Sequence, residues 1–555
     1  MARIRPVRII PLGGTGEVGK NATVIEYGSD VVLVDAGVKF PEEEQLGVDL
    51  VIPDFTYLHQ NIDRLRGILL THGHEDHIGA VPYLLSQMGR RLPIFGAPLT
   101  LGMLEGKLKE HKVLKLAEMY RVSPVDTVRL GSIEARFFRV NHSVPDALAI
   151  VLQTPAGLVL HTGDFKLGEG GVDAAPTDLV DLRRTVERGV LVLLSDCVRV
   201  EEPGRTPPEE VVGETLDRLI AEAPGRVILT TFASNIIRMR QAIRAAHRHG
   251  RKVAVAGRSM EENLRVASEL GYLDIPKGAL VKVEEARKLS PREVMFITTG
   301  SQGEPTSVLA RIAVGDHPQI AIRPDDTVIL AATPVPGNEE TVSQTIDNLF
   351  RRGARVVYRA VVETVHVSGH ASRDELREMI VMARPEFCVP VHGEYRHMVL
   401  YREVAQETGI APSRVFLADI GEVLEFAPGM GRKRGRIPAG SVLVDGLTVG
   451  GVTKVVLRDR RRLAEEGVLI VALAVDRETG ELLAGPDLIA RGFVRPLDGN
   501  IEEQAKLELR QALRRRPRGE PEPGFLSSKS KEVLGRFIYQ QTGQRPLILT
   551  VVTEI

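Results

Sequence analysis

Residues 69–79 read LLTHGHEDHIG, which places three histidines and an aspartate close together after a short apolar run. The apolar run predicts a strand, and the residues after the cluster predict the start of a helix. Imidazole and carboxylate groups are suitable ligands for zinc or manganese. His72 and His74 alternate along an extended turn and can reach one ion, whereas Asp76 and His77 can face a second one. A surface loop that binds nothing is the alternative interpretation.

Further candidate ligands follow this cluster, each in a short polar turn after an apolar run: His142, Asp164 and His392. Taken singly, each would more often be an ordinary loop residue. Their order behind the first cluster favours a common site, since two ions bridged by a carboxylate are an arrangement that hydrolyses phosphoesters.

Four apolar runs in the N-terminal part end in polar tips at Asp35, His72, Asp164 and Asp196. This pattern predicts one sheet with a site along its edge.

The composition is that of an ordinary globular protein, with 555 residues, 43% apolar and 26% charged residues, and a formal net charge of −1. This length predicts about three domains. The near-zero net charge excludes a globally basic nucleic-acid-binding protein, although it allows a local basic groove. The two cysteines, Cys197 and Cys388, cannot form a disulfide framework and favour a reducing compartment. No run is apolar enough for a signal peptide or a membrane span, so we expect a cytoplasmic protein without a membrane partner.

The motif His72-x-His74-x-Asp76-His77, with its distant partners, resembles the metallo-β-lactamase superfamily. This resemblance implies two divalent ions per chain, with zinc expected and manganese or magnesium as alternatives. The implied ligands of the first ion are His72, His74 and His142. The implied ligands of the second ion are Asp76, His77 and His392, and Asp164 would bridge the two ions. Asp35 would orient the ligand loop, although a simple turn residue is the alternative for that position.

The long interval between Asp164 and His392 predicts a whole domain inserted between them, in which strands alternate with helices over a mostly parallel sheet. Such an insertion resembles the β-CASP branch of the superfamily, whose members cut nucleic acid. Further motifs along the whole chain resemble the bacterial ribonuclease J family: Ile10–Asn21, Thr71–Gly79, Phe232–Asn235, Gly257–Met260, Thr299–Glu304 and His366–Ser372.

The implied fold class is α/β, a metallo-β-lactamase αββα sandwich with an inserted parallel-sheet β-CASP domain and a small α/β C-terminal domain. We expect the metallo-β-lactamase domain in two parts, residues 1–205 and 359–430, around a β-CASP domain at 206–358. A Gly/Pro-rich, basic linker region is expected at 431–467, before a C-terminal domain at 468–555. The resemblance implies that the last segment serves self-association. The basic runs Arg432–Arg436 and Arg458–Arg462 are interpreted as solvated faces, with RNA contact as the alternative.

His370 is the candidate donor of a proton to the leaving 3′-oxygen, oriented by Asp196. A further metal ligand or a structural turn histidine is the alternative for His370. Two turns are candidate sites for the RNA backbone and a 5′-monophosphate. The first comprises Ala233, Ser234 and Asn235, and the second comprises His366, Val367, Ser368, Gly369 and His370. Helix N-terminal amides attract anions at the first turn, although an ordinary N-cap explains Ser234 equally well.

The resemblance implies a metal-dependent ribonuclease that acts as a 5′→3′ exonuclease favouring 5′-monophosphate ends and as an endonuclease. It implies roles in mRNA decay and rRNA maturation. The expected partners are RNA, further copies of the chain in a homodimer or homotetramer, and other RNA-decay proteins. A DNA-processing β-CASP nuclease is the alternative, because discrimination of the 2′-OH depends on pocket shape. Two segments depart from the family pattern, Cys197–Arg199 and Lys166–Asp173, and neither removes a candidate ligand.

Overall fold

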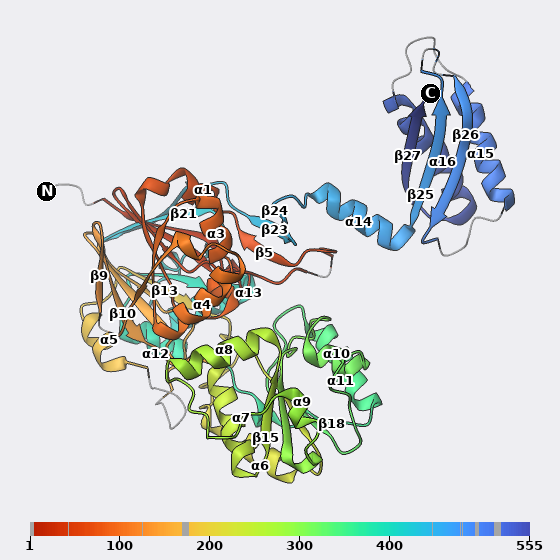
Figure 1. The fold of residues 1–555 in the computed structure, drawn as a ribbon. Coiled ribbons are helices and arrows are strands. Elements are labelled where there is room, and N and C mark those ends of the chain that lie inside the picture. The colour runs from red at the N-terminus through yellow and green to blue at the C-terminus, as the bar shows by residue number, and fades with distance from the viewer. Residues whose placement is uncertain are drawn as a thin grey trace. The chain divides into compact units, whose positions relative to one another are not determined.

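The computed structural model describes residues 5–555 except 43, 125, 169–176, 447, 478, 480, 494–498 and 515–522. The chain divides into two compact units (Figure 1). The first comprises Met1–Phe40 with Leu50–Val442, and the second comprises Pro41–Asp49 with Leu443–Ile555. Each unit has a hydrophobic core of its own.

The first unit is built on two β-sheets that share one core, to which Ile25 and Val32 contribute from one sheet and Phe137 and Ile150 from the other. The first sheet has the order β22-β21-β1-β3-β4-β6-β7-β8. Its strands are β1 (Val7–Gly13), β3 (Ala22–Tyr27), β4 (Asp30–Val34), β6 (Leu65–Leu69), β7 (Leu92–Gly96), β8 (Ala117–Arg121), β21 (Glu422–Ala427) and β22 (Met430–Arg436).

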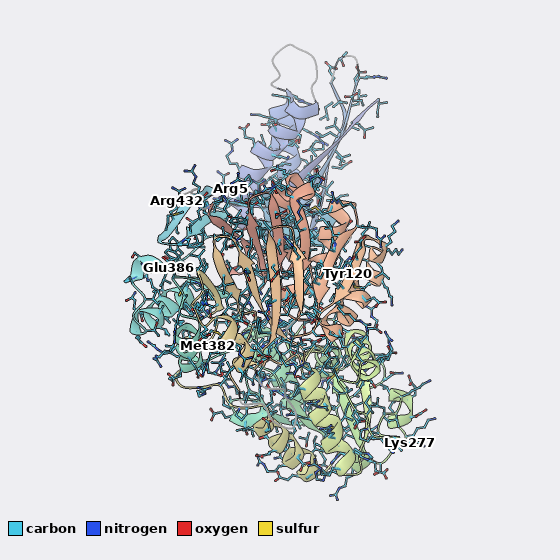
Figure 2. The ribbon with its side chains drawn as sticks, turned by 90° about the vertical axis from the view of Figure 1, so that its left-hand side faces the viewer. Arg5, Tyr120, Lys277, Met382, Glu386 and Arg432 are labelled. Carbon is cyan, nitrogen blue, oxygen red and sulfur yellow. The ribbon has the colours of Figure 1, made fainter. Side chains whose placement is uncertain are left out.

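The second sheet has the order β19-β13-β12-β11-β10-β9. Its strands are β9 (Thr127–Leu130), β10 (Ile133–Arg139), β11 (Leu148–Thr154), β12 (Gly157–His161), β13 (Val192–Asp196) and β19 (Phe387–Val391). Helix α4 (Pro98–Glu110) contacts the first sheet, and α12 (Arg373–Ala383) and α13 (Tyr395–Glu407) contact the second. In Figure 2 the labelled Tyr120 of β8 and the labelled Glu386, next to β19, lie on opposite sides of these strands. This is the predicted αββα sandwich.

The expectation that the four polar-tipped strands share one sheet is wrong. The strands before Asp35 and His72 are β4 and β6 of the first sheet, whereas those before Asp164 and Asp196 are β12 and β13 of the second. All four are apolar because each is covered by helices on one face and by the other sheet on the opposite face. The hydrophobic pattern therefore shows burial without showing which sheet a strand joins. The site lies where the ends of both sheets meet.

The inserted domain contains a five-stranded sheet of order β15-β16-β14-β17-β18, in which every pairing is parallel. This confirms the predicted parallel sheet. Its strands are β14 (Val227–Thr230), β15 (Lys252–Ala256), β16 (Val294–Thr298), β17 (Thr327–Leu330) and β18 (Arg355–Val357). Helix α6 (Glu210–Glu222) precedes the first of these strands, and helices α7 (Ile236–Arg248), α8 (Arg258–Glu269), α10 (Val308–Val314) and α11 (Glu339–Arg351) lie between them (Figure 1).

The start of the expected linker region is an ordered hairpin. Strands β21 and β22 pair with each other, and β21 also pairs with β1, so this basic stretch extends the first sheet. Arg432 pairs with Glu425 at 2.7 Å and Lys433 with Glu422 at 2.8 Å. These cross-strand ion pairs make a strongly basic strand compatible with the sheet. Later in the same expected linker lie β23 (Ser441–Asp445) and α14 (Lys454–Glu466).

The second unit contains a sheet of order β26-β25-β27 with helices on one face (Figure 1). Its strands are β25 (Val468–Val475), β26 (Leu482–Arg491) and β27 (Leu547–Glu554), and its helices after α14 are α15 (Gly499–Arg514) and α16 (Pro523–Thr542). The sequence pattern predicted α15 and missed α16. Among the residues that the structure describes, no helix is long and apolar enough to cross a membrane.

Candidate metal centre

The structure brings all seven predicted ligands to one place at the ends of strands. They fall into two groups, and within each group the potential ligand atoms lie within 4.8 Å of one another. The first group is His72, His74, His142 and Asp164, and the second is Asp76, His77, Asp164 and His392. Because Asp164 belongs to both groups, it occupies the position expected of a bridging carboxylate.

The Asp164 carboxylate lies at the centre of the cluster. Its Oδ2 atom is 3.1 Å from Nε2 of His77 and 3.6 Å from Nε2 of His72. The same oxygen is 3.7 Å from Nε2 of His392 and 4.0 Å from Nε2 of His142. Four imidazole nitrogens thus face one carboxylate oxygen in a buried site.

Hydrogen bonds at the far side of each ring orient the imidazoles. Nδ1 of His77 donates to Oδ2 of Asp35 at 2.8 Å, and Nδ1 of His142 donates to the carbonyl of Gly369 at 2.8 Å. Nε2 of His74 lies 3.0 Å from Oγ of Ser143, within hydrogen-bond distance. These contacts leave the remaining ring nitrogens available as ligands, as outer partners do in metal sites.

Asp35 and Asn21 are polar residues that hydrogen-bond to the candidate ligands His77 and His392. Asp35 accepts hydrogen bonds from the backbone N–H and the hydroxyl of Thr71, both at 2.8 Å, in addition to the bond from His77. The Asn21 amide oxygen lies 3.0 Å from Nδ1 of His392. Asp35 therefore orients a candidate ligand, and the competing interpretation as a simple turn residue does not describe its contacts.

The local backbone is adapted to this close packing. Asp35 and His392 have positive φ angles of 60° and 50°, a region that costs energy for residues other than glycine. Gly37 lies so close to helix α2 (Glu75–Ile78) that a Cβ atom there would be 1.5 Å from the carbonyl oxygen of Asp76. Only glycine fits at that position, which explains the Asp35-Ala36-Gly37 order after β4.

The chemistry of these residues fits divalent cations. Nε2 of His72 is buried and has no hydrogen-bond partner in the described part of the chain, a costly situation for a polar atom. Burial, followed by the neighbouring histidines, holds the pKa of His72 well below its usual range, so the ring is neutral and can act as a ligand. Burial raises the pKa of Asp164 to about 7. A divalent cation among these groups would pair the orphaned nitrogen and stabilise the carboxylate.

The predicted catalytic pair also forms. Nδ1 of His370 lies 2.8 Å from Oδ2 of Asp196, and these two residues with Asp164 make a third group of potential ligands. Burial lowers the pKa of His370 to about 3 and raises the pKa of Asp196. Both shifts have the same cause, because burial disfavours the charged form of each group. The alternative of His370 as a further ligand stays open, because its Nδ1 is 4.0 Å from Asp164.

The two predicted substrate turns adjoin each other through one arginine. Arg238 of α7 donates to Nδ1 of His366 at 3.2 Å. Asn235, rather than Ser234, caps α7, because its side chain accepts from the N–H of Arg238. In the second turn the Val367 side chain is buried. The remaining predicted members of the turns are Ala233, Ser368 and Gly369; the Ser368 hydroxyl accepts from the N–H of His370 at 3.2 Å.

Sequence reasoning missed the buried ionic network behind the second turn. Glu209 pairs with Lys166 at 3.2 Å and with Arg238 at 2.9 Å, and all three side chains are at most 1% exposed. Lys166 also donates to the carbonyl of Ser368 at 3.1 Å, so the network holds the turn. Lys166 begins the segment Lys166–Asp173, which departs from the family pattern, and residues 169–173 of that segment lie outside the described residues.

Comparisons with known proteins agree with this geometry. The chain matches models for the metallo-β-lactamase superfamily at residues 15–198, the ribonuclease J β-CASP domain at 224–349, a Zn-dependent metallo-hydrolase RNA specificity domain at 355–417 and the ribonuclease J C-terminal domain at 455–555. It is 40% identical to ribonuclease J2 of Bacillus subtilis over 552 residues, which covers 99% of both chains. The chain belongs to the ribonuclease J family. Another relative, ribonuclease J of Thermus thermophilus, is 41% identical over 99% of this chain and 95% of its own.

Membership in the ribonuclease J family confirms the predicted α/β fold class and the prediction of a metal-dependent ribonuclease. A solved structure of a protein of unknown function from Enterococcus faecalis V583 has a TM-score of 0.51 to this chain at 16% identity. The match covers 76% of this chain and 100% of that one. This likeness concerns the fold alone.

Proposed function

We propose that the chain hydrolyses RNA phosphodiester bonds with two divalent ions, as a 5′→3′ exonuclease that favours 5′-monophosphate ends and as an endonuclease. Its processes would be mRNA decay and rRNA maturation. The observation that carries this proposal is Asp164, whose Oδ2 lies within 4.0 Å of imidazole nitrogens from both ligand groups. An arrangement in which one carboxylate joins two ions suits in-line phosphoryl displacement.

Bound divalent ions would supply Lewis acidity toward the phosphate and lower the pKa of water. The residues of the chain perform the other tasks. The outer hydrogen bonds of Asp35 and Gly369 fix the orientation of His77 and His142. His370 would hold the proton for the leaving 3′-oxygen at Nε2, while Asp196 binds its Nδ1 and keeps that ring in place.

The preference for a 5′-monophosphate would arise at the two adjoining turns. Arg238 connects α7 to His366, and Lys166 holds the carbonyl of Ser368, so the turn is fixed by two buried cations. Hydroxyl and N–H donors in such a turn can surround one phosphate. Two further phosphates would need additional space and counter-charge, so a triphosphate end would be the poorer substrate.

We propose zinc as the native metal, because imidazole and carboxylate donors in this number suit it, with manganese and magnesium as alternatives. Cys197 and Cys388 are buried and unpaired. Free thiols fit a reducing compartment, and we therefore propose a cytoplasmic location. Other RNA-decay proteins are further proposed partners.

Self-association is proposed for the second unit. The face of its sheet opposite the helices carries Ile489, Ile470 and Leu549 side by side in register. Val551 on the same face is 53% exposed and Leu549 is 44% exposed. A second copy that covers this apolar row would give a homodimer, and two such dimers a homotetramer.

The test is the degradation of one end-labelled RNA that carries a 5′-monophosphate, a 5′-triphosphate or a 5′-hydroxyl, beside a DNA of the same sequence. Fastest decay of the monophosphate form, with mononucleotide products from the 5′ end, is the expected result. Equal decay rates for all three RNA forms would contradict the proposed preference for 5′-monophosphate ends. Cleavage of DNA in preference to RNA would favour the alternative, a DNA-processing β-CASP nuclease.

A further inference from the structure

The second unit contains an open groove of about 550 Å³ that lies outside the metal centre. Helix α14 forms one wall, helix α16 forms another, and the start of β27 contributes the remainder. Gly535 on α16 also lines the groove, and because it has no side chain it leaves that part of the groove open. This is the segment of the chain in which the basic run Arg458–Arg462 lies.

The groove is strongly basic. Five exposed cationic side chains line it: Arg458, Arg462, Lys531, Arg536 and Arg545. Asp459 is the single carboxylate among the described lining residues. Positions 458 and 462 are one helical turn apart on α14, so both arginines point to the same side of that helix. A protein with a formal net charge of −1 therefore concentrates positive charge in one concave surface.

Most of these cations have no ion pair among the described residues, although the Glu532 carboxylate on α16 interacts electrostatically with Arg536. Within the described part of the chain, Arg462, Lys531 and Arg536 have no carboxylate at ion-pair distance, and Arg458 has only its neighbour Asp459 at 3.5 Å. Other cations of the same unit are paired: Lys506 lies 2.6 Å from Glu502, and Lys529 lies 2.9 Å from Glu532. A groove in which five cations face one lining carboxylate has an excess of positive charge, and this excess favours an anionic ligand.

One end of the groove has a stacking surface. The guanidinium of Arg545 lies over the Tyr539 ring, 4.4 Å from its centroid, and the Tyr539 side chain is 46% exposed. Guanidinium planes and aromatic rings are the surfaces on which unpaired bases stack. A free phosphate would bind to the cations, but it has no base that could stack on Arg545 and Tyr539.

We propose that this groove binds single-stranded RNA at a second site, with phosphates on the cations of α14 and α16 and a base on the Arg545–Tyr539 pair. The proposal rests on the proposed function only in that RNA is the substrate. A second contact of this kind would raise the affinity for long RNA, because the strand that is held at the groove is already at a high effective concentration near the protein. An RNA too short to occupy both sites would gain nothing.

The test compares two triple variants of the full chain with equal loss of charge. Arg462→Ala/Lys531→Ala/Arg536→Ala removes groove cations, and Arg477→Ala/Lys506→Ala/Lys529→Ala removes cations of the same unit outside the groove. Fluorescence anisotropy measures the binding of a labelled 30-nucleotide RNA in chelator, where no cleavage occurs. Each lost phosphate contact lowers the slope of log affinity against log salt by about 0.7, so three contacts lower it by about 2. Between 50 and 200 mM salt, the wild type and the control should thus lose roughly 20-fold more affinity than the groove variant.

A second variant, Tyr539→Leu, should weaken binding about fivefold or more without changing the salt slope, because stacking is not electrostatic. Equal slopes for the two triple variants would overturn the proposal. A change of subunit number in light scattering, seen only in the groove variant, would also overturn it, since the groove would then hold a second copy. Failure of RNA cleavage leaves the binding test intact, so the failure of the groove and the failure of the proposed function are distinguishable.

Discussion

Replacing Glu209 by glutamine should destabilise the first unit strongly, because Glu209 is the one carboxylate that faces both Lys166 and Arg238 in the described structure. Burial raises the pKa of Glu209, but Lys166 and Arg238 outweigh burial and bring it down to about 2. Since one pKa unit corresponds to about 1.4 kcal/mol, the charge of Glu209 contributes about 3 kcal/mol. Loss of one partner from a buried ion pair typically costs about 3–5 kcal/mol, which agrees with this figure.

Differential scanning calorimetry would measure the effect. At about 2–4 °C per kcal/mol, a loss of about 3 kcal/mol lowers the unfolding midpoint of this unit by about 6–12 °C. The matched control is Arg265→Gln, which breaks two ion pairs on the exposed surface of α8 and should leave the midpoint unchanged. A shift below about 2 °C for Glu209→Gln would refute the reasoning.

The difference in unfolding midpoint between wild type and Glu209→Gln should depend on pH in a definite direction. The folded-state pKa of Glu209 is lowered, so its stabilisation is fully present above the unfolded-state pKa of about 4.5 and is lost as the pH falls toward about 2. The midpoints of wild type and Glu209→Gln should therefore differ by a constant amount between about pH 6 and 8 and converge below about pH 4.5. A difference that grows on acidification would contradict the assignment.

The network should also matter for catalysis, because Lys166 holds the carbonyl of Ser368 in the second substrate turn. A displaced turn can lower the cleavage rate by up to about 100-fold. The apolar triple variant Lys166→Met/Glu209→Leu/Arg238→Met separates the two effects, since replacing a whole buried ionic set often restores stability. Stability that returns without activity supports the positioning role, whereas full activity in this variant would exclude it.

Three further predictions concern the metal, the 5′ end and the assembly. Metal analysis should find about two divalent ions per chain, and His77→Ala should lower this content and abolish hydrolysis while circular dichroism stays unchanged; an active variant would contradict the metal assignment. Ser234→Ala combined with Ser368→Ala should remove most of the preference for 5′-monophosphate over triphosphate in single-turnover decay, a loss of about 1–3 kcal/mol, while internal cleavage changes less. Ile489→Lys combined with Val551→Lys should lower the mass in light scattering, and an unchanged subunit number would move the interface elsewhere.

The proximity of the candidate ligands could be predicted because their signals are local. Each candidate follows an apolar run that ends at the point where the chain leaves a sheet, and the six positions from His72 to His77 already contain four of them. The distant members His142, Asp164 and His392 carried the same local signature. The assignment to two sheets could not be read in this way, because a strand that is buried on both faces has the same composition in either sheet.

The ionic network shows where local patterns stop being informative. Lys166, Glu209 and Arg238 each stand in a segment whose charge is typical of a solvated surface, and nothing near them in the sequence indicates that they meet. Their burial depends on the packing of the inserted domain against the sandwich, because α7 carries Arg238 and the segment after β12 carries Lys166. Charged residues are rarely buried unless they are paired. The burial of these three residues therefore cannot be predicted without knowing that they pair with one another. Such a network exists only in the tertiary structure. Lys166 and Arg238 of this network contact Ser368 and His366, which belong to the turn that the sequence predicts as a substrate site.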